Sequence, residues 1–123
     1  IIDLETAALQ RWAEGDPDGF LHLYSPDVVY FDPFHEHRLE GLKALTELYN
    51  SIRGQVRLDR FDMIDPRVVI AGDMALLTFN FRSVGDQVNK WNATEVYRRM
   101  DGAWRIIHSH WSITKPELLE PEI

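Results

Sequence analysis

The feature that most constrains this chain is a tight turn, Asp101 followed by Gly102, between two long runs of strand-forming residues. Glycine adopts positive φ without steric cost and aspartate tolerates it, so the pair predicts a β-hairpin. Residues 87–100 precede the turn and residues 103–113 follow it, and both runs are rich in β-branched and aromatic side chains. We expect this hairpin to form one wall of a pocket.

The order of the other elements indicates an α+β fold. Hydrophobic spacing predicts helices over residues 4–14, 17–24 and 42–52, the first with Leu4, Ala8 and Trp12 on its buried face. Extended runs follow over residues 28–32, 56–64, 67–71 and 74–84, with a turn at Asp65 and Pro66. The pattern predicts a curved antiparallel β-sheet with three N-terminal helices laid across its concave face, which leaves an internal pocket between sheet and helices.

Length and composition exclude several classes of protein. The 123 residues fit one domain over residues 1–123. The net charge of −7, without a run of basic residues, argues against nucleic-acid binding. There is no cysteine, which excludes disulfides and thiolate chemistry, and no apolar run long enough to cross a membrane. A cytoplasmic location is the default expectation.

Two carboxyl groups are candidates for chemistry. Asp32 precedes Pro33 at the end of an apolar run, where it either caps a turn or acts as a base at the pocket mouth. Glu95 lies in the middle of a strand among aromatic residues. It either faces solvent and pairs with Arg82 or Arg105, or it is desolvated, stays protonated and donates a hydrogen bond.

Four histidines raise a metal-binding alternative. His108 and His110 are two residues apart, so they share one face of a strand and could bind Zn or Fe. His35 and His37, in the loop after Asp32, could complete such a site. The loop is either solvated or folds over the pocket, in which case His35 could shuttle protons.

The chain resembles the nuclear transport factor 2-like superfamily, and within it the SnoaL-like proteins and the association domain of calcium/calmodulin-dependent protein kinase II. The resemblance is carried by the order of the elements, Gly15 with Asp16, Asp32 with Pro33, Gly41, and the segment 101–112. It implies a cone-shaped fold with a pocket. Isomerases, polyketide cyclases, dehydratases, epoxide hydrolases and association domains all belong to this superfamily, so the fold leaves the activity open.

Two branches of the superfamily give specific expectations. In the ketosteroid isomerase branch, Asp32 matches the general base and Glu95 the protonated acid of the oxyanion hole, whereas Ala8 replaces the catalytic tyrosine. In the kinase-association branch, Glu95 and Trp111 occupy the positions of two pocket arginines. The resemblance therefore implies a base and a donor, but neither that tyrosine nor that anion site.

The same resemblance implies which side chains face the pocket. It places Tyr97, Ile107, Ser109 and Trp111 inward, with Phe79 and Phe81 beside them. Two further residues are predicted to bind the ligand from their own chemistry: Tyr24, whose ring could stack on a ligand, and His35, if its loop folds over the pocket. This phase places Trp104, Ile106, His108 and His110 on the outer face of the sheet. That face is too apolar to stay exposed, so we expect a homodimer through it and no bound metal.

Two functional hypotheses follow. In the first, the protein is an isomerase, cyclase or dehydratase without a cofactor. Asp32 removes a proton next to a carbonyl group and Glu95 stabilises the enolate of a small apolar or carbonyl-containing ligand. In the second, the protein is a non-catalytic ligand-binding or association domain.

Overall fold

The computed structural model describes residues 1–114, and residues 115–123 lie outside the described part. Within this part, three helices and six strands follow one another in this order: α1 (Ile2–Ala13), α2 (Asp18–Leu21), β1 (Tyr24–Phe31), β2 (Leu39–Glu40), α3 (Leu42–Ser51), β3 (Arg60–Ala71), β4 (Met74–Val84), β5 (Val88–Met100) and β6 (Ala103–Ile113). The expected α+β class is confirmed. No helix in the described part has the length and apolar character needed to cross a bilayer.

The strands form one curved sheet in the order β2-β1-β6-β5-β4-β3. Strands β3 to β6 are joined by successive hairpins and pair antiparallel, as expected from the turn signals. Strand β1 instead runs parallel to β6. The sheet is therefore mixed rather than wholly antiparallel, because β1 reaches β6 through long-range pairing that no turn in the sequence encodes.

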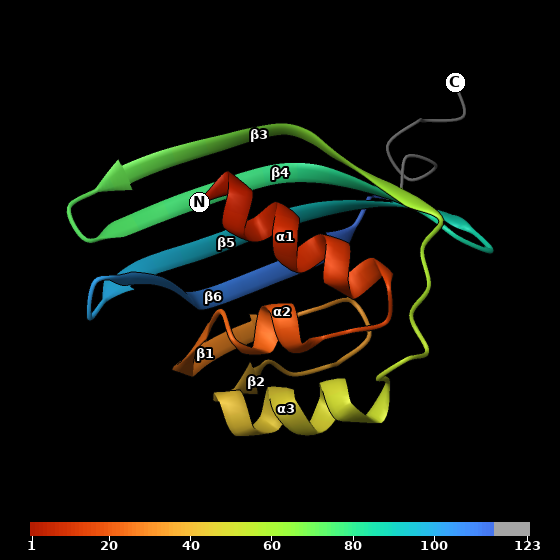
Figure 1. Ribbon diagram of the computed structural model, residues 1–123, viewed down its shortest axis with the longest axis horizontal. Helices are drawn as coiled ribbons and strands as arrows, with labels where there is room; N and C mark the ends of the chain where they lie inside the picture. Colours follow the sequence, from red (N-terminus) through yellow and green to blue (C-terminus); the bar gives the residue numbers. More distant parts are fainter. Residues whose placement is uncertain (115–123) are drawn as a thin grey trace.

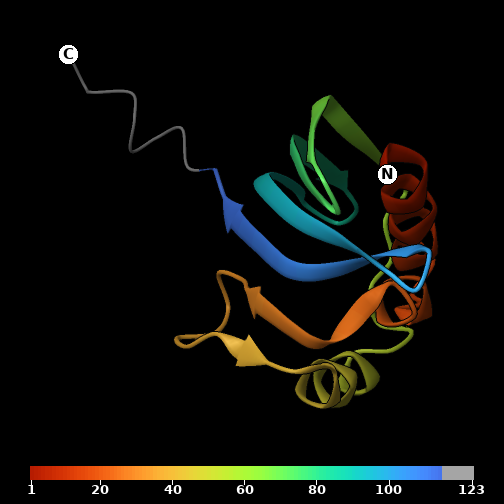
Figure 2. The ribbon, with the colours of Figure 1, turned by 90° about the vertical axis from the view of Figure 1, so that its left-hand side faces the viewer.

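All three helices lie on the concave side of the sheet (Figures 1 and 2). Side chains along the strands point alternately to this inner face and to the outer face. In β4, every second side chain is buried: Ala75, Leu77, Phe79, Phe81 and Ser83. The helices and this inner face enclose the hydrophobic core. None of the helices in residues 1–114 covers the outer, convex face (Figure 2).

The first helix buries most of the predicted face, since Ala8 and Leu9 are buried and Trp12 packs against the core. The prediction is wrong for Leu4, which is 40% exposed, whereas Glu5 is fully buried. Tyr24, expected at the end of the second helix, is the first residue of β1.

One bulge interrupts β3 where a turn was predicted. The register passes from Ile64 opposite Asn80 to Arg67 opposite Thr78, so β3 contains one residue more than its partner. Asp65 takes a positive φ of 51° there. The Asp65–Pro66 signal was correct for the backbone conformation, but the strand continues because a bulge absorbs the extra residue.

A second bulge, in β6, reverses the side-chain phase. Val96 pairs with His108, and Tyr97 pairs with Ile106, so Ile107 is the extra residue. Ile106 consequently points into the core and is fully buried, whereas Ile107 is only half-buried. The prediction that Ile107 faces inward is wrong, and so is the placement of Ile106 on the outer face.

Trp104 lies two residues before Ile106 on β6, so its side chain points to the same, inner face of the sheet. It is half-buried against the core cluster, and the Arg99 guanidinium carbon lies 4.6 Å from its ring centroid. Its predicted outer position is therefore also wrong. Alternation resumes after the bulge, so Ser109 is buried while His110 is exposed.

Two backbone hydrogen bonds close one end of the space between helices and sheet. Gly54 N–H donates to the Gly15 carbonyl over 2.9 Å, and Leu58 N–H donates to the Ala13 carbonyl over 3.0 Å. Gly15 has a φ of +86°, and a Cβ there would lie 3.1 Å from the Val56 carbonyl oxygen. The end of α1 is thereby fixed against the segment that leads into β3.

Candidate functional site

A cavity of about 470 Å³ lies between the concave face of the sheet and the helices. Its aromatic lining comprises Trp12, Phe20, Tyr24, Tyr30, Phe34, Tyr49, Phe81, Trp91 and Trp111. Apart from the tyrosine hydroxyls and the indole N–H groups, its polar side chains are Asp32, His35, Ser83 and Asn89. A concave, mostly aromatic cavity with few polar groups is typical of a small-molecule site.

Asp32 lies directly after β1, at the mouth of this cavity. Its side chain is only 7% exposed. Oδ1 accepts hydrogen bonds from the backbone N–H groups of Phe34 and His35, at 2.9 and 3.0 Å, and lies 2.8 Å from His35 Nδ1. Asp32 thus caps a turn and lines the cavity at once, so the two interpretations of its sequence context are compatible.

His35 is the neighbour that folds over this site. It lines the cavity while its side chain stays 36% exposed. Its Nδ1 contact fixes the ring on the Asp32 carboxylate, and a proton on Nδ1 makes that contact a hydrogen bond. The other ring nitrogen is then the one available for proton exchange with solvent or a ligand.

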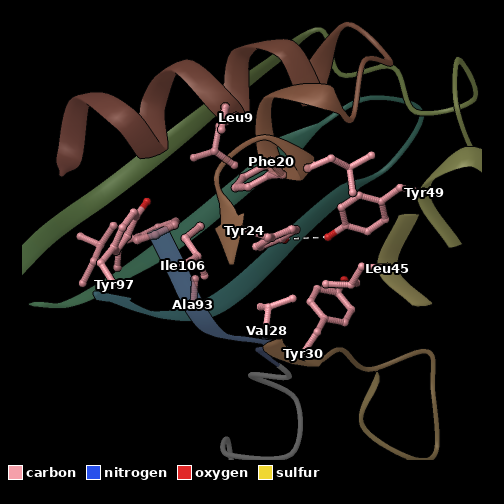
Figure 3. Close-up of a cluster of buried hydrophobic side chains, with 14 of the residues drawn as sticks. Leu9, Phe20, Tyr24, Val28, Tyr30, Leu45, Tyr49, Ala93, Tyr97 and Ile106 are labelled. Carbon is pink, nitrogen blue, oxygen red and sulfur yellow. Dashed lines mark hydrogen bonds between the residues drawn. The ribbon is translucent and has the colours of Figure 1, made fainter. Parts of the chain in front are cut away.

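Three tyrosines bring hydroxyl groups to the cavity wall. The Tyr24 and Tyr49 hydroxyl oxygens are 2.8 Å apart, and their rings point toward one another from β1 and α3 (Figure 3). Tyr30 lies edge-on to Tyr49, with ring centroids 6.1 Å apart. Burial raises the pKa of all three phenols well above their ordinary value, so each is a neutral O–H at physiological pH.

Glu95 is fully buried and is not paired with arginine. Ser109 Oγ donates to Glu95 Oε1, and Trp111 Nε1 donates to Ser109 Oγ over 3.1 Å. Of the two predicted solvent partners, Arg82 lies 3.6 Å from Asp62, and Arg105 donates to a backbone carbonyl. The solvent-facing alternative for Glu95 is therefore wrong.

Glu5 is the residue that the sequence interpretation missed. It is fully buried on α1 and accepts a 2.6 Å hydrogen bond from the Tyr97 hydroxyl. The available signal was its position in the helix: Glu5 stands three, four and seven residues before Ala8, Leu9 and Trp12. A carboxyl group at that spacing falls on the buried face of the helix.

Glu5 and Glu95 form a buried pair of carboxyl groups. Burial is the main cause that raises the pKa of Glu95 well above its usual value, followed by the negative charge of Glu5. Burial also raises the pKa of Glu5, against hydrogen bonds from Glu95 and Tyr97. Within residues 1–114, Oε2 of each carboxyl has no hydrogen-bond partner. Because burial and the neighbouring Glu5 raise the pKa of Glu95 well above its usual value, we assign a proton to Glu95.

The carboxyl pair does not open onto the cavity that Asp32 lines. Of the described residues, the cavity wall includes Trp111 but not Glu5, Glu95, Tyr97 or Ser109. The Trp111 indole contacts the cavity and donates to Ser109, so the carboxyl pair lies one layer behind it. The structure thus does not bring Asp32 and Glu95 face to face.

The other predicted ligand-binding residues divide in the same way. Tyr24, His35, Phe81 and Trp111 line the cavity. Phe79 packs behind it, edge-on to Trp111 with ring centroids 5.6 Å apart. The wall also contains residues that were not predicted, among them Tyr30 and Tyr49. Tyr49 could have been found from the predicted buried face of its helix.

Residues 1–116 match the SnoaL-like domain. The chain belongs to the SnoaL-like family. A solved structure from Parabacteroides distasonis ATCC 8503, provisionally described as a ketosteroid isomerase, is 47% identical, with a TM-score of 0.85 over 94% of this chain and 86% of that one. A nuclear transport factor 2-like protein of unknown function from Pseudomonas putida KT2440 is 31% identical, with a TM-score of 0.81 over 89% and 81%.

The hub of calcium/calmodulin-dependent protein kinase II from S. rosetta shares the fold of this SnoaL-like chain. It is 21% identical, with a TM-score of 0.73 over 92% of this chain and 93% of that one. The expected resemblance, with its isomerase-like and association-domain neighbours, is thus confirmed. No curated protein sequence matches the chain.

The histidines of this SnoaL-like protein do not converge on a metal site. His108 and His110 lie on the outer face, where the Phe31 ring stacks on His110 with centroids 5.0 Å apart. His37 lies in a separate hollow of about 420 Å³, away from His35. Among residues 1–114, no three His, Asp or Glu side chains gather in a way that could hold a metal ion.

Proposed function

We propose that this SnoaL-like protein is a cofactor-independent enzyme that transfers a proton on a small, apolar carbonyl compound, with Asp32 as the base. The observation that carries the proposal is a nearly buried carboxylate at the mouth of an aromatic cavity. A base in such a site reaches a carbon-bound proton while the cavity excludes water. The 47% identity to a protein provisionally described as a ketosteroid isomerase supports the same chemistry.

The proposed reaction needs only groups of the protein and the ligand. The Asp32 carboxylate takes a proton from the carbon next to the carbonyl group, and the electron pair of that C–H bond moves to the carbonyl oxygen as an enolate. Return of the proton from Asp32 to another carbon of the enolate completes an isomerisation. In a β-hydroxy ketone the enolate re-forms the carbonyl group and expels the hydroxyl group, which takes the proton from Asp32 and leaves as water, completing a dehydration. The His35 contact at 2.8 Å orients the carboxylate for this transfer.

Hydrogen exchange in a two-ring ketone tests the proposal directly. We expect the protein to catalyse exchange of the C2 hydrogens of 1-tetralone in D₂O, followed by NMR. The Asp32→Asn variant should exchange at least about a hundredfold more slowly. Asp73→Asn is a matched control, because Asp73 lies in the exposed β3–β4 turn. Equal exchange by wild type and Asp32→Asn would disprove the role of Asp32.

A second function, association with further copies of the chain, is favoured by the outer face of the sheet. One row crosses five strands through the paired residues Val29, His108, Val96, Leu76 and Val69. Val69 is 63% exposed and Leu76 is 40% exposed. This corrected row replaces the predicted interface, which included the inward-facing Ile106. We propose that a second copy covers it.

Light scattering tests the association proposal. The wild type should be a dimer or larger at micromolar concentration, and Leu76→Glu should shift it toward monomer, because burying that carboxylate costs free energy. Glu47→Lys, an exposed change on α3, should leave the mass unchanged. A monomeric wild type would refute the interface. The cytoplasmic location stays a prediction that cell fractionation would test.

A further inference from the structure

The mouth of the aromatic cavity carries an acidic side chain that no lysine or arginine of residues 1–114 pairs with. The Asp32 side chain is 7% exposed, and its ion-pair partner is His35. A neutral His35 ring donates from Nδ1 without cancelling the charge of the carboxylate. Because a nearly buried charge is stable when an opposite charge meets it, this carboxylate favours a positively charged group in the cavity.

The rest of the cavity wall provides aromatic faces rather than groups that would hold an anion. Among the described residues that line the cavity there is no lysine or arginine. The indole N–H of Trp91 donates to Ser83 Oγ and that of Trp111 to Ser109 Oγ, each over 3.1 Å. Both indoles therefore use their one donor inside the protein, and only their rings are left to contact a ligand.

Three of the rings form what we call the aromatic corner: Phe34, Trp91 and Trp111. The Trp91 and Trp111 ring centroids are 6.2 Å apart with the ring planes at 81°, and those of Phe34 and Trp91 are 6.0 Å apart at 72°. Phe34 N–H donates to Asp32 Oδ1, so the corner begins beside the carboxylate. Rings at near right angles turn their faces toward a common space, and each face carries the negative charge density that attracts a cation.

We propose that the cavity mouth binds a small organic cation, a quaternary ammonium group on an apolar body, between the Asp32 carboxylate and the aromatic corner. The methyl groups of such a cation suit aromatic walls, because they spread the positive charge over an apolar surface and need no hydrogen-bond acceptor. The apolar body extends into the cavity of about 470 Å³. The proposal needs the charge of Asp32 and not its action as a base, so it stands apart from the proposed reaction.

Two further features favour a cation over an anion. Burial is the main cause that raises the pKa of Tyr24, and negative charge on Glu95 and Glu5 adds to it, so the potential of the carboxyl pair reaches the cavity wall. The net charge of −7 also raises the concentration of cations near the protein surface. Both effects act in the same direction as the charge of Asp32.

The test compares phenyltrimethylammonium with tert-butylbenzene, which has the same shape without the charge. Ligand-observed NMR titrations give the dissociation constants of both compounds. Asp32→Asn should weaken binding of the cation by at least about tenfold, because the carboxylate is nearly buried, and should leave the affinity for tert-butylbenzene unchanged. Asparagine keeps an oxygen that accepts the N–H groups of Phe34 and His35, so the turn is retained.

Asp101→Asn is the matched control, because it removes the same charge from the exposed β5–β6 turn. Asp101 has a positive φ of 52°, which asparagine also tolerates, and both affinities should stay as in wild type.

Fluorinated tryptophan at position 91 tests the aromatic corner without a change of shape. Each added fluorine withdraws negative charge from the ring face of Trp91. The affinity for phenyltrimethylammonium should therefore fall with each fluorine, whereas that for tert-butylbenzene should not. Cation binding that is indifferent to fluorination would overturn the assignment of the cation to this corner.

The outcomes separate this proposal from the proposed reaction. If Asp32→Asn weakens binding of both compounds equally, or of neither, the cation site is refuted. Cation binding that depends on Asp32, without hydrogen exchange in 1-tetralone, would support the site and remove the reaction. Exchange that depends on Asp32, without binding of phenyltrimethylammonium, would remove the site and leave the reaction standing.

Discussion

Replacing Glu95 with glutamine should remove a pH-dependent cost from the folded state. Burial raises the pKa of Glu95, so the folded protein keeps a proton that the unfolded chain releases above about pH 4.3. Below that pH both states are protonated and the burial has no such cost. As the pH rises, ionisation of this carboxyl group lowers the free energy of the unfolded chain but not that of the folded protein. The free energy of unfolding therefore falls until the pH reaches the raised pKa of Glu95 in the folded protein.

The magnitude follows from the number of protons held. One proton kept only by the folded state changes stability by about 1.4 kcal/mol for each pH unit between the pKa of Glu95 in the unfolded chain and its raised pKa in the folded protein. Glutamine has nearly the same shape, accepts from Ser109 and donates to Glu5, but it does not titrate. The stability of Glu95→Gln relative to wild type should therefore rise with pH along this slope.

Urea unfolding followed by tryptophan fluorescence measures this difference at each pH. The double variant Glu5→Gln/Glu95→Gln shows how many protons the folded pair holds. If the pair holds one proton, the stability of the double variant relative to wild type should rise by about 1.4 kcal/mol per pH unit, and if it holds two protons, by about twice that amount. Glu47→Gln, an exposed change on α3, should give no slope. A flat difference for both the single and the double variant would show that the folded pair is ionised, and would refute the reasoning.

Two further predictions follow from the β6 bulge and from the Asp32 contact. Ile106→Ala should lower the free energy of unfolding by about 2–5 kcal/mol because Ile106 is fully buried, whereas Ile107→Ala should cost about 1 kcal/mol or less; equal losses in urea titrations would contradict the bulge. His35→Ala should slow hydrogen exchange in 1-tetralone by about tenfold or more while binding changes little, because the ring orients Asp32 through the 2.8 Å contact. An unchanged rate would remove His35 from the reaction.

The sequence was sufficient wherever a local rule determined the structure. Strands β4 (Met74–Val84) and β6 (Ala103–Ile113) have the predicted bounds, because the turn before each strand contains a glycine at positive φ, Gly72 and Gly102 respectively. Asp32 was correctly placed at a strand end, since proline after it stops the strand. Phe79 and Phe81 of β4, which the resemblance placed on the inner face, are buried there.

The tertiary structure decided what depends on pairing between distant segments. The parallel contact of β1 with β6 and the bulge at Ile107 follow from how strands fit a curved sheet, and a one-residue bulge reverses every side chain on one side of it. That is why Ile106 and Ile107 were exchanged in the prediction. The pattern of apolar and polar residues within β6 does not indicate where the extra residue lies.

The candidate site shows the same division. The sequence by itself determined the family fold, the position of Asp32 at the end of β1 and the presence of a carboxyl group, Glu95, in the middle of a buried strand. Only the tertiary structure brought Glu5 onto Glu95 and the hydroxyl of Tyr49 onto that of Tyr24, because each pair joins a helix to a strand far away in the chain. Desolvation and shared protons arise from these long-range contacts, which local spacing does not specify.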